Sequence, residues 1–277
     1  IELAEYAIAN KISEEPAFAW WVQFVLKKRN RMINAVKKKY WRTTHKFGIR
    51  LPKNVPDALR MDEENGNHLW RDSIKKEMAK AQVAYTEVSN SDPEEARKGN
   101  VPELIGFQEI KCHTIFDIKI DFTRKARFVA GGHMTEAPSS LTYSSVVSRD
   151  SVKIAFLIGA LNDLDIMACD IGNAYLNAPC REKIWFEAGP ECGELNGKAC
   201  KVVRALYGLK SSGASWRAMF SDFIQTKLGF KPTRIDPDVY IRQNNKPSGE
   251  PYYEMLLVYV DDCLVVSHDP NEVMKGI

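Results

Sequence analysis

Short unbroken runs of apolar residues dominate the C-terminal part of the chain, and each run is typical of a buried strand. Residues 255–258 and 263–266 flank a turn-like pair of acids, Asp261 and Asp262, so they predict a hairpin with both aspartates at or beside its turn. A third apolar run ends at Asp170. If that strand lies beside the hairpin, three carboxylates converge at one edge of a sheet.

Carboxylates that converge in this way repel one another unless a cation neutralises them. Hard divalent ions such as Mg²⁺ prefer oxygen ligands, and a three-carboxylate cluster can hold two ions about 4 Å apart for phosphoryl transfer. An ordinary surface turn is the alternative for Asp261 and Asp262, because Asp is common in turns. Asp163 and Asp165 lie in a polar connection nearby, and we interpret them as solvated loop acids.

Three segments show the three-to-four-residue apolar spacing of amphipathic helices. The first runs from about 69 to 82, the second follows a cap at Ser148 or Asp150 and is expected to pack beneath the sheet, and the third ends at Gly229. Their apolar positions are Trp70, Ile74 and Met78, then Val152, Ala155, Phe156 and Gly159, then Trp216, Met219, Phe220, Phe223 and Leu228.

A hairpin is predicted between residues 115 and 129. On its return strand Lys125 and Arg127 share one face by the two-residue period, while Ala126 and Phe128 share the other. Two cations on one face of a hairpin could clamp a triphosphate. A solvated strand face is the alternative.

The net charge of +3 conceals a basic N-terminus. Residues 1–50 hold 11 Lys and Arg against 4 Asp and Glu, a net charge of +7, and aromatic residues are interleaved with them. Such a helix could grip a nucleic-acid backbone; the alternative, that its aromatic residues pack and its lysines are solvated, fits the helical spacing better. We therefore divide the chain into a basic helical segment (1–50), a turn-rich linker (51–68) and a folded domain (69–277).

Other features of the sequence bear on its environment. No run of 18 apolar residues and no signal-peptide pattern appears, so we expect a protein of the cytoplasm or nucleus with no membrane partner. The six cysteines lack C-x-x-C spacing, and free thiols are expected.

Four stretches, in order, resemble the polymerase motifs of a known family. They are FTRKARFVAGGH (122–133), DIGNAYLNAP (170–179), LYGLKSSGASW (206–216) and YVDD (259–262). The chain resembles the reverse transcriptases of copia-type long-terminal-repeat retrotransposons over roughly residues 66–277. Each motif alone is weak, but four in the right order are specific.

This resemblance implies an α+β fold, the fingers and palm of a right-hand polymerase, with an antiparallel palm sheet backed by helices and truncated before the thumb. The implied reaction is RNA-directed DNA synthesis with two Mg²⁺ ions, for which Mn²⁺ can substitute. Implied partners are an RNA or DNA template with its primer, deoxynucleotide triphosphates and the rest of a retroelement polyprotein. A retroelement particle in the cytoplasm is the implied setting.

The resemblance also assigns roles to residues. Asp170, Asp261 and Asp262 would be catalytic metal ligands, and the backbone carbonyl of Ile171 would add an oxygen. The nucleotide-binding residues would be Lys125, Arg127, Gly172, Asn173, Ala174 and Tyr175, where the Tyr175 ring would exclude a 2′-hydroxyl. The residues that position template or nucleotide would be Tyr207, Gly208, Lys210, Ser212, Gly213 and Tyr259.

Two other functions remain as alternatives. The chain could be a retroelement remnant that at most binds nucleic acid, because the resemblance implies that the primer grip and thumb lie beyond Ile277. It could also be an RNA-dependent RNA polymerase, which shares the paired-aspartate hairpin, although Tyr175 disfavours that interpretation. Ser212-Gly213 stands where many relatives have Ser-Pro, a departure expected to change loop stiffness more than chemistry.

Overall fold

The structure, a computed structural model, divides into two compact units. One unit joins Ile1–Pro52 with Asp117–Thr123, and the other joins Lys53–Phe116 with Arg124–Ile277. The residues that the structure describes are 27–31, 44–89, 92–136, 138 and 142–277.

In the smaller unit a short hairpin stands where the sequence analysis predicts helix. β1 (His45–Lys46) and β2 (Ile49–Arg50) pair antiparallel around Phe47 and Gly48, which both have positive φ. Two successive left-handed residues reverse the chain, so the prediction of helix up to residue 50 is wrong here. Residues 27–31 are helical, and the rest of the predicted basic helix lies outside the described residues.

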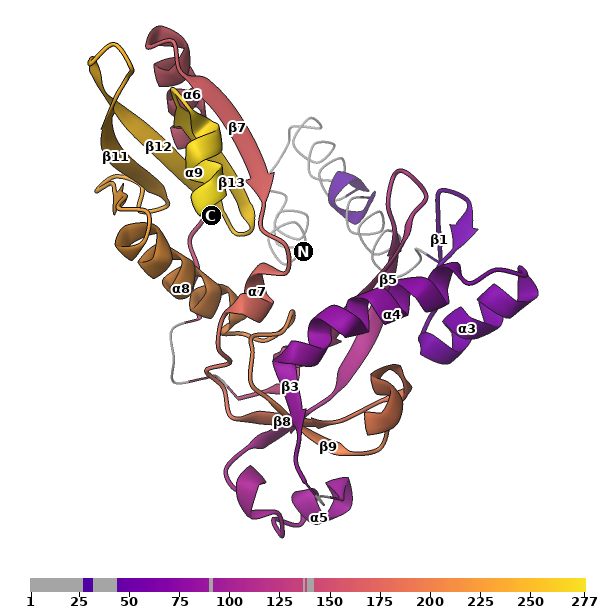
Figure 1. The fold of residues 1–277 in the computed structure, drawn as a ribbon. Helices are drawn as coiled ribbons and strands as arrows, with labels where there is room; N and C mark the ends of the chain where they lie inside the picture. The colour runs from indigo at the N-terminus through magenta and orange to yellow at the C-terminus, as the bar shows by residue number, and fades with distance from the viewer. Residues whose placement is uncertain (1–26, 32–43, 90–91, 137, 139–141) are drawn as a thin grey trace, which may run out of the picture. The chain divides into compact units, whose positions relative to one another are not determined.

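The larger unit contains a five-stranded sheet in which every neighbouring pair is antiparallel (Figure 1). Its last strand in sequence pairs with its first, so β13 lies between β12 and β7. In spatial order the strands are β10 (Lys231–Pro232), β11 (Val239–Asn245), β12 (Pro251–Tyr259), β13 (Asp262–Ser267) and β7 (Asp165–Asp170).

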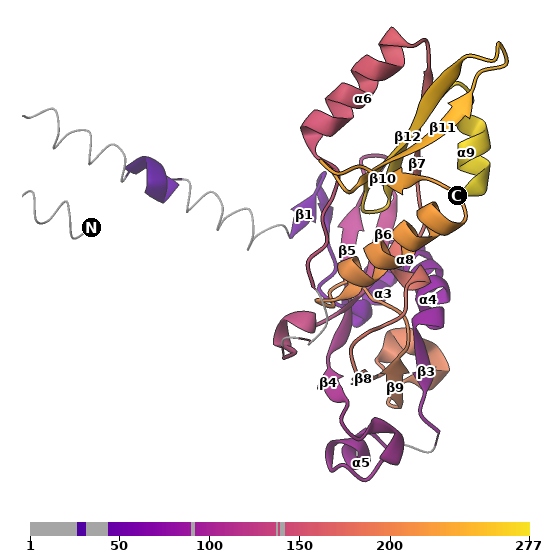
Figure 2. The ribbon, with the colours of Figure 1, turned by 90° about the vertical axis from the view of Figure 1, so that its left-hand side faces the viewer.

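Helices cover both faces of this sheet. Figure 2 shows α6 (Arg149–Leu161) and α9 (Pro270–Gly276) on opposite sides of it. A large apolar cluster joins α8 (Ser212–Thr226) and α9 to one face through Trp216, Phe220 and Val273, and a smaller cluster lies on the α6 face. The predicted mixture of helices and antiparallel strands is confirmed.

The α6 helix contacts the sheet along a narrow row of small residues. Its N-cap is Ser148, as predicted, and Ala155 and Gly159 are buried. A Cβ on Gly159 would lie 3.1 Å from Val266 Cγ1, so glycine allows the helix to approach closely. Phe156 is 48% exposed, and its predicted place in the core is wrong because it flanks the contact row.

A second sheet is mixed and has four strands. β9 (Ala199–Val202) pairs antiparallel with both β3 (Tyr85–Glu87) and β8 (Ile184–Glu187), whereas β4 (Gln108–Ile110) pairs parallel with β8. Two short helices, α5 (Pro93–Arg97) and α7 (Ala174–Asn177), lie in the connections.

The predicted hairpin and the first predicted helix are confirmed, and they support each other. The hairpin consists of β5 (Cys112–Ile118) and β6 (Arg124–Ala130), and the helix is α4 (Leu69–Ala81). Ser73 Oγ accepts a hydrogen bond from Ala126 N at 2.7 Å, and Glu77 Oε1 accepts one from Phe128 N at 3.1 Å. Side chains of α4 therefore satisfy the backbone of an edge strand.

The predicted linker over 51–68 contains a helix, α3 (Val55–Glu64), and this correction has a local cause. Asn54 caps the helix by accepting a hydrogen bond from Asp57 N at 2.9 Å, with proline in the first turn. Asp62, 1% exposed, accepts hydrogen bonds from the backbone amides of Trp70 and Arg71 and so anchors the start of α4.

In the described part of the chain, helices are too short or too polar to cross a bilayer. All six cysteines are free thiols, as predicted.

Candidate active site

Strand register brings two of the predicted metal ligands together. β13 pairs with β7 so that Asp262 lies directly opposite Asp170. The next pair, Ile171 and Asp261, is joined by a hydrogen bond from Ile171 N to Asp261 O at 2.8 Å. Hydrogen-bonded and non-hydrogen-bonded pairs alternate, so Asp170 and Asp262 form a non-hydrogen-bonded pair, in which Cα atoms lie about 4.5 Å apart. Their side chains therefore share one face as close neighbours.

The third aspartate lies in the turn of the hairpin. Tyr259 pairs with Asp262, which leaves a two-residue loop of Val260 and Asp261. Val260 has a φ of 59°, and a positive φ at the first loop position alone is the pattern of a type II′ turn. Glycine is usual at that position because a β-branched residue is strained there. The predicted hairpin with its acids at the turn is thus confirmed, with an unpredicted strained valine.

The aspartates offer the oxygen ligands that Mg²⁺ prefers, but they do not surround an ion completely. Within the described ranges, no three His, Cys, Asp or Glu side chains already form a cage for a metal ion. Mg²⁺ is usually held by one or two carboxylates together with substrate phosphates, so a preformed cage is not what this ion requires. Asp170 and Asp262 are exposed, adjacent and purely oxygen donors. They fit an ion that arrives with a nucleotide.

Beside the aspartates, an aromatic pair joins two motifs that are distant in sequence. The rings of Tyr175 and Tyr207 have centroids 4.7 Å apart at an angle of 48°, and the Arg127 guanidinium lies 6.0 Å from the Tyr207 centroid. Burial, and then the charge of Asp261, raises the pKa of both phenols, so both remain neutral donors at physiological pH. The structure therefore groups Arg127, Tyr175 and Tyr207 near Asp261.

A close backbone contact explains two glycines of the motifs. Gly208 has a φ of 96°, and a Cβ there would lie 2.1 Å from Ala130 O. A Cβ on Gly132 would lie 2.3 Å from Gly208 O. A hydrogen bond from Ala130 N to Tyr207 O at 2.7 Å stabilises this contact. The loop after Leu206 is thereby fixed to the end of β6.

Within that loop, two predicted positioning residues have structural partners. Ser212, 1% exposed, donates its hydroxyl proton to Leu206 O at 2.6 Å, and Lys210 Nζ donates to Thr135 O. These side chains shape the loop. Gly213 lies nearer the tyrosines, since a Cβ there would be 3.9 Å from the Tyr175 hydroxyl.

The remaining predicted residues occupy different surroundings. Gly172 borders open space, and Asn173 has a φ of 57°, ahead of α7. Ala174 is 1% exposed and belongs to the core, so its side chain is not available to a ligand. Lys125 is half-buried on β6, where Ala126 is buried.

A cavity of about 460 Å³ lies beside the two paired aspartates. Tyr259 lines it together with Asp170 and Asp262, and Phe156 and Leu257 form part of its apolar wall. The face of the sheet that carries the carboxylates is therefore hollow next to them.

A set of polar contacts between α8 and the hairpin region was not predicted from the sequence. Trp216 was assigned only to a helix core, yet its Nε1 donates to Val260 O at 2.7 Å. Next to it, Arg217 Nε lies 2.7 Å from the buried carboxylate of Asp238. A buried indole N–H usually requires an acceptor, and that rule is the signal that could have found the first contact.

Comparison with known proteins defines the class of this chain. A family model described as reverse transcriptase (RNA-dependent DNA polymerase) matches residues 102–276, and the chain belongs to that family. The matched relatives are copia-type polyproteins, in agreement with the resemblance seen in the motifs.

Two of these relatives illustrate the extent of the sequence similarity. The retrovirus-related Pol polyprotein from transposon TNT 1-94 of Nicotiana tabacum is 31% identical over 180 residues, which cover 61% of this chain. The transposon Ty1-DR5 Gag-Pol polyprotein of Saccharomyces cerevisiae is 28% identical over 264 residues, which cover 91% of this chain. In each case the match spans 13% of the relative's length.

Proposed function

We propose that this chain supplies the fingers and palm of a copia-type RNA-directed DNA polymerase. The reaction is attack of a primer 3′-hydroxyl on the α-phosphate of a deoxynucleotide, with release of pyrophosphate. The observation that carries the proposal is the register that sets Asp170 opposite Asp262, with Asp261 in the adjoining turn. Family membership selects template-directed polymerisation among the phosphoryl transfers that such carboxylates support.

The carboxylates act as the ligands of divalent ions in this proposal. Two Mg²⁺ ions, when bound, would lower the pKa of the attacking hydroxyl and offset charge on the departing phosphates. Asp170 and Asp261 are the principal ligands, Asp262 completes the cluster, and the Ile171 carbonyl supplies a further oxygen. Mn²⁺ has similar ligand preferences and can replace Mg²⁺.

The β5–β6 hairpin acts as the fingers and the five-stranded sheet as the palm. Arg127 is exposed on β6 and lies against Tyr207, so its guanidinium can pair with a triphosphate while its stem stays packed. Lys125 shares that strand face and adds a second cation. Gly172 borders open space, so the backbone there can approach the phosphates, with Asn173 next to it.

Tyr175 is the proposed steric filter against ribonucleotides. Its ring is held by the contact with the Tyr207 ring, and its hydroxyl lies near Gly213. A ring held in this way cannot retreat from an added 2′-oxygen. Tyr207, Gly208 and Gly213 shape the nucleotide and template site directly, and Lys210 and Ser212 act by holding the loop. Tyr259 helps to position template or nucleotide from the cavity that it lines with Asp170 and Asp262.

Primer extension tests the proposal. The natural polypeptide that contains residues 1–277 is given an RNA template, a primer and Mg²⁺, and Tyr175→Ala is expected to raise ribonucleotide incorporation about 10- to 200-fold relative to deoxynucleotide incorporation. Tyr253→Ala, at a 58% exposed position on β12, is the control and should leave selectivity unchanged. A wild-type protein without template-dependent extension would contradict the proposed function.

A further inference from the structure

Hydrogen bonds from outside the hairpin hold the peptide groups immediately before and after Asp261. The Val260 carbonyl belongs to the peptide before Asp261, and it accepts the Trp216 Nε1 hydrogen bond at 2.7 Å. The Asp261 carbonyl belongs to the peptide after it, and it accepts the Ile171 amide at 2.8 Å. Fixing both peptide planes restricts φ and ψ of Asp261, and therefore the direction in which its side chain leaves the backbone.

This restraint matters because the turn is strained. Val260 adopts a φ of 59°, which a β-branched residue disfavours. Strained residues persist only where their surroundings hold them, and they occur often at functional sites. A single hydrogen bond from α8 reaches the carbonyl of this strained residue.

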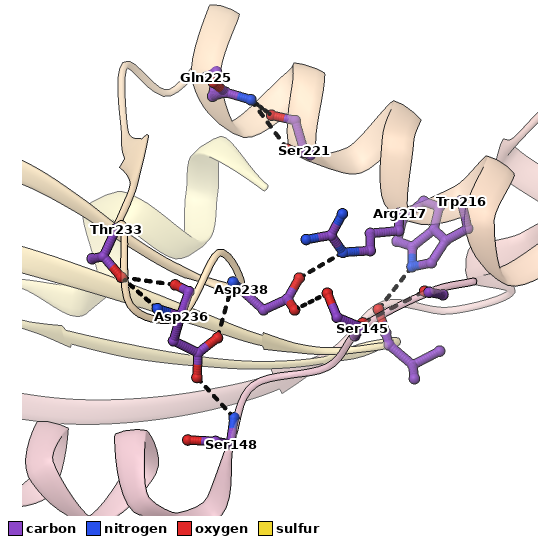
Figure 3. A network of polar contacts seen from close by, with 11 residues as sticks. Ser145, Ser148, Trp216, Arg217, Ser221, Gln225, Thr233, Asp236 and Asp238 are labelled. Carbon is purple, nitrogen blue, oxygen red and sulfur yellow. Dashed lines mark hydrogen bonds and ion pairs between the residues drawn. The ribbon is translucent and has the colours of Figure 1, made fainter. Parts of the chain in front are cut away.

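Trp216 is itself rigid. It is 3% exposed, and its ring stacks on Phe220 with centroids 4.9 Å apart and planes 9° apart. Its neighbour Arg217 binds Asp238 Oδ1 at 2.7 Å, and Asp238 is 2% exposed. Figure 3 shows Trp216 and Arg217 pointing from the same helix toward the segment around Asp238 and Ser145.

The same set of polar contacts also holds the strand that leads into the turn, through Asp238. Ser145 Oγ donates to the Asp238 carboxylate, and Val258 N donates to Asp238 O at 2.9 Å. Val258 O in turn accepts Val147 N at 3.0 Å. Val258 precedes Val260 by two residues, so α8 holds both the strand and its turn.

We propose that Trp216 is a positioning residue that sets the Asp261 carboxylate for divalent-ion binding. The inference rests on the proposed function, in which Asp261 is a metal ligand. Trp216 touches neither nucleotide nor ion in this account and acts through the Val260 carbonyl. Because α8 begins at Ser212, next to the nucleotide loop, the bond also links that loop to the metal ligands.

Trp216→Phe removes the N–H donor and keeps an aromatic ring on Phe220. Trp70→Phe is the matched control, because Trp70 is also 3% exposed in the same unit but lies on α4. In the natural polypeptide, W216F should raise the Mg²⁺ concentration for half-maximal primer extension about tenfold, the effect typical of losing an outer-shell partner. W70F should lower the thermal midpoint similarly and leave the Mg²⁺ requirement unchanged.

Combining W216F with Val260→Gly tests the mechanism. Glycine adopts a positive φ without strain, so the turn no longer needs the indole to hold it. W216F should then change the Mg²⁺ requirement less than about twofold relative to V260G alone. An equal effect in both backgrounds would overturn the role assigned to strain.

Mn²⁺ binding followed by electron paramagnetic resonance separates this inference from the proposed function. W216F should bind Mn²⁺ about tenfold more weakly than the wild type and W70F. Equal Mn²⁺ affinity in all three proteins would overturn the inference, whatever their polymerase activity. Normal Mn²⁺ binding by a wild type that extends no primer would count against the proposed function alone.

Discussion

The two faces of the five-stranded sheet differ in how they are covered. On the α8 and α9 face, large side chains such as Phe220, Phe230 and Leu256 are buried in one continuous cluster. On the α6 face, the helix touches the sheet through small residues, and a cavity of about 460 Å³ adjoins Asp170 and Asp262. One face is packed around a continuous apolar core, and the other carries a cavity beside the two aspartates.

The two-residue period of a strand produces this division. Cys263 is buried in the cluster of the packed face, whereas its neighbour Asp262 is exposed on the hollow face. The packed face also contains a carboxylate, Glu254, but Arg242 pairs with it at 2.6 Å. Among the described residues, Asp170 and Asp262 have no basic partner, and the proposed function assigns them to divalent ions.

Removal of a metal ligand should have the largest effect. Asp170→Asn should lower primer extension by about a thousandfold or more, because metal ions supply several kcal/mol of transition-state stabilisation. Its thermal midpoint should not fall, since the change removes one of two adjacent like charges. Asp163→Asn, at an exposed position with a φ of 52° that asparagine tolerates, is the control and should retain full activity.

Truncation on the packed face should mainly affect stability. Phe230 is 1% exposed, and Phe230→Ala should lower the free energy of unfolding by about 3–5 kcal/mol. Urea denaturation measures the change. A loss below about 1 kcal/mol would show that this face is not the stabilising one.

The buried acid of the packed face should make stability depend on pH. Burial alone would raise the pKa of Glu254, but hydrogen bonds from Asn244 and Ser267 and the ion pair with Arg242 outweigh it and lower the pKa. The stabilisation is therefore present above the ordinary glutamate pKa of about 4.3 and is lost as the pH falls through the lowered value. Urea midpoints between pH 6 and pH 3 should fall less steeply for Glu254→Gln than for the wild type; parallel curves would contradict this assignment.

Truncation on the hollow face should have the smallest effect on stability. Phe156 is 48% exposed, so Phe156→Ala should change the free energy of unfolding by less than about 1 kcal/mol. The comparison with Phe230→Ala uses the same chemical change on opposite faces. Equal losses of unfolding free energy in the two variants would contradict the difference drawn between the two faces of the sheet.

The sequence predicted those parts of the fold whose signals are local. Continuous apolar runs predicted the strands around Asp170 and Asp262. The period of two correctly placed Ala126 and Phe128 on one face of β6, and the structure shows that face to be the buried one. The pairing of β7 with β13 was the condition under which the sequence analysis expected the aspartates to converge, and the strand register meets that condition.

Other features depend on contacts that a pattern does not contain. Phe156 has helical core spacing, but the close approach at Gly159 decides which side of α6 is buried. Proline and asparagine near residue 54 indicated a turn, although the same residues start helices. The Trp216 bond to Val260 joins residues 44 positions apart, so the pattern of α8 implies a buried indole in need of an acceptor but does not identify that acceptor.

In the proposed function, Asp170, Asp261 and Asp262 jointly bind the ions used in nucleotide transfer. The most direct measurement is an anomalous difference map from crystals of the natural polypeptide with primer, template, an incoming nucleotide and Mn²⁺. Peaks are expected about 2.1 Å from carboxylate oxygens of Asp170 and Asp261, the distance typical of Mg²⁺ sites. Peaks bound only by other residues, with these aspartates unliganded beside an ordered nucleotide, would contradict it.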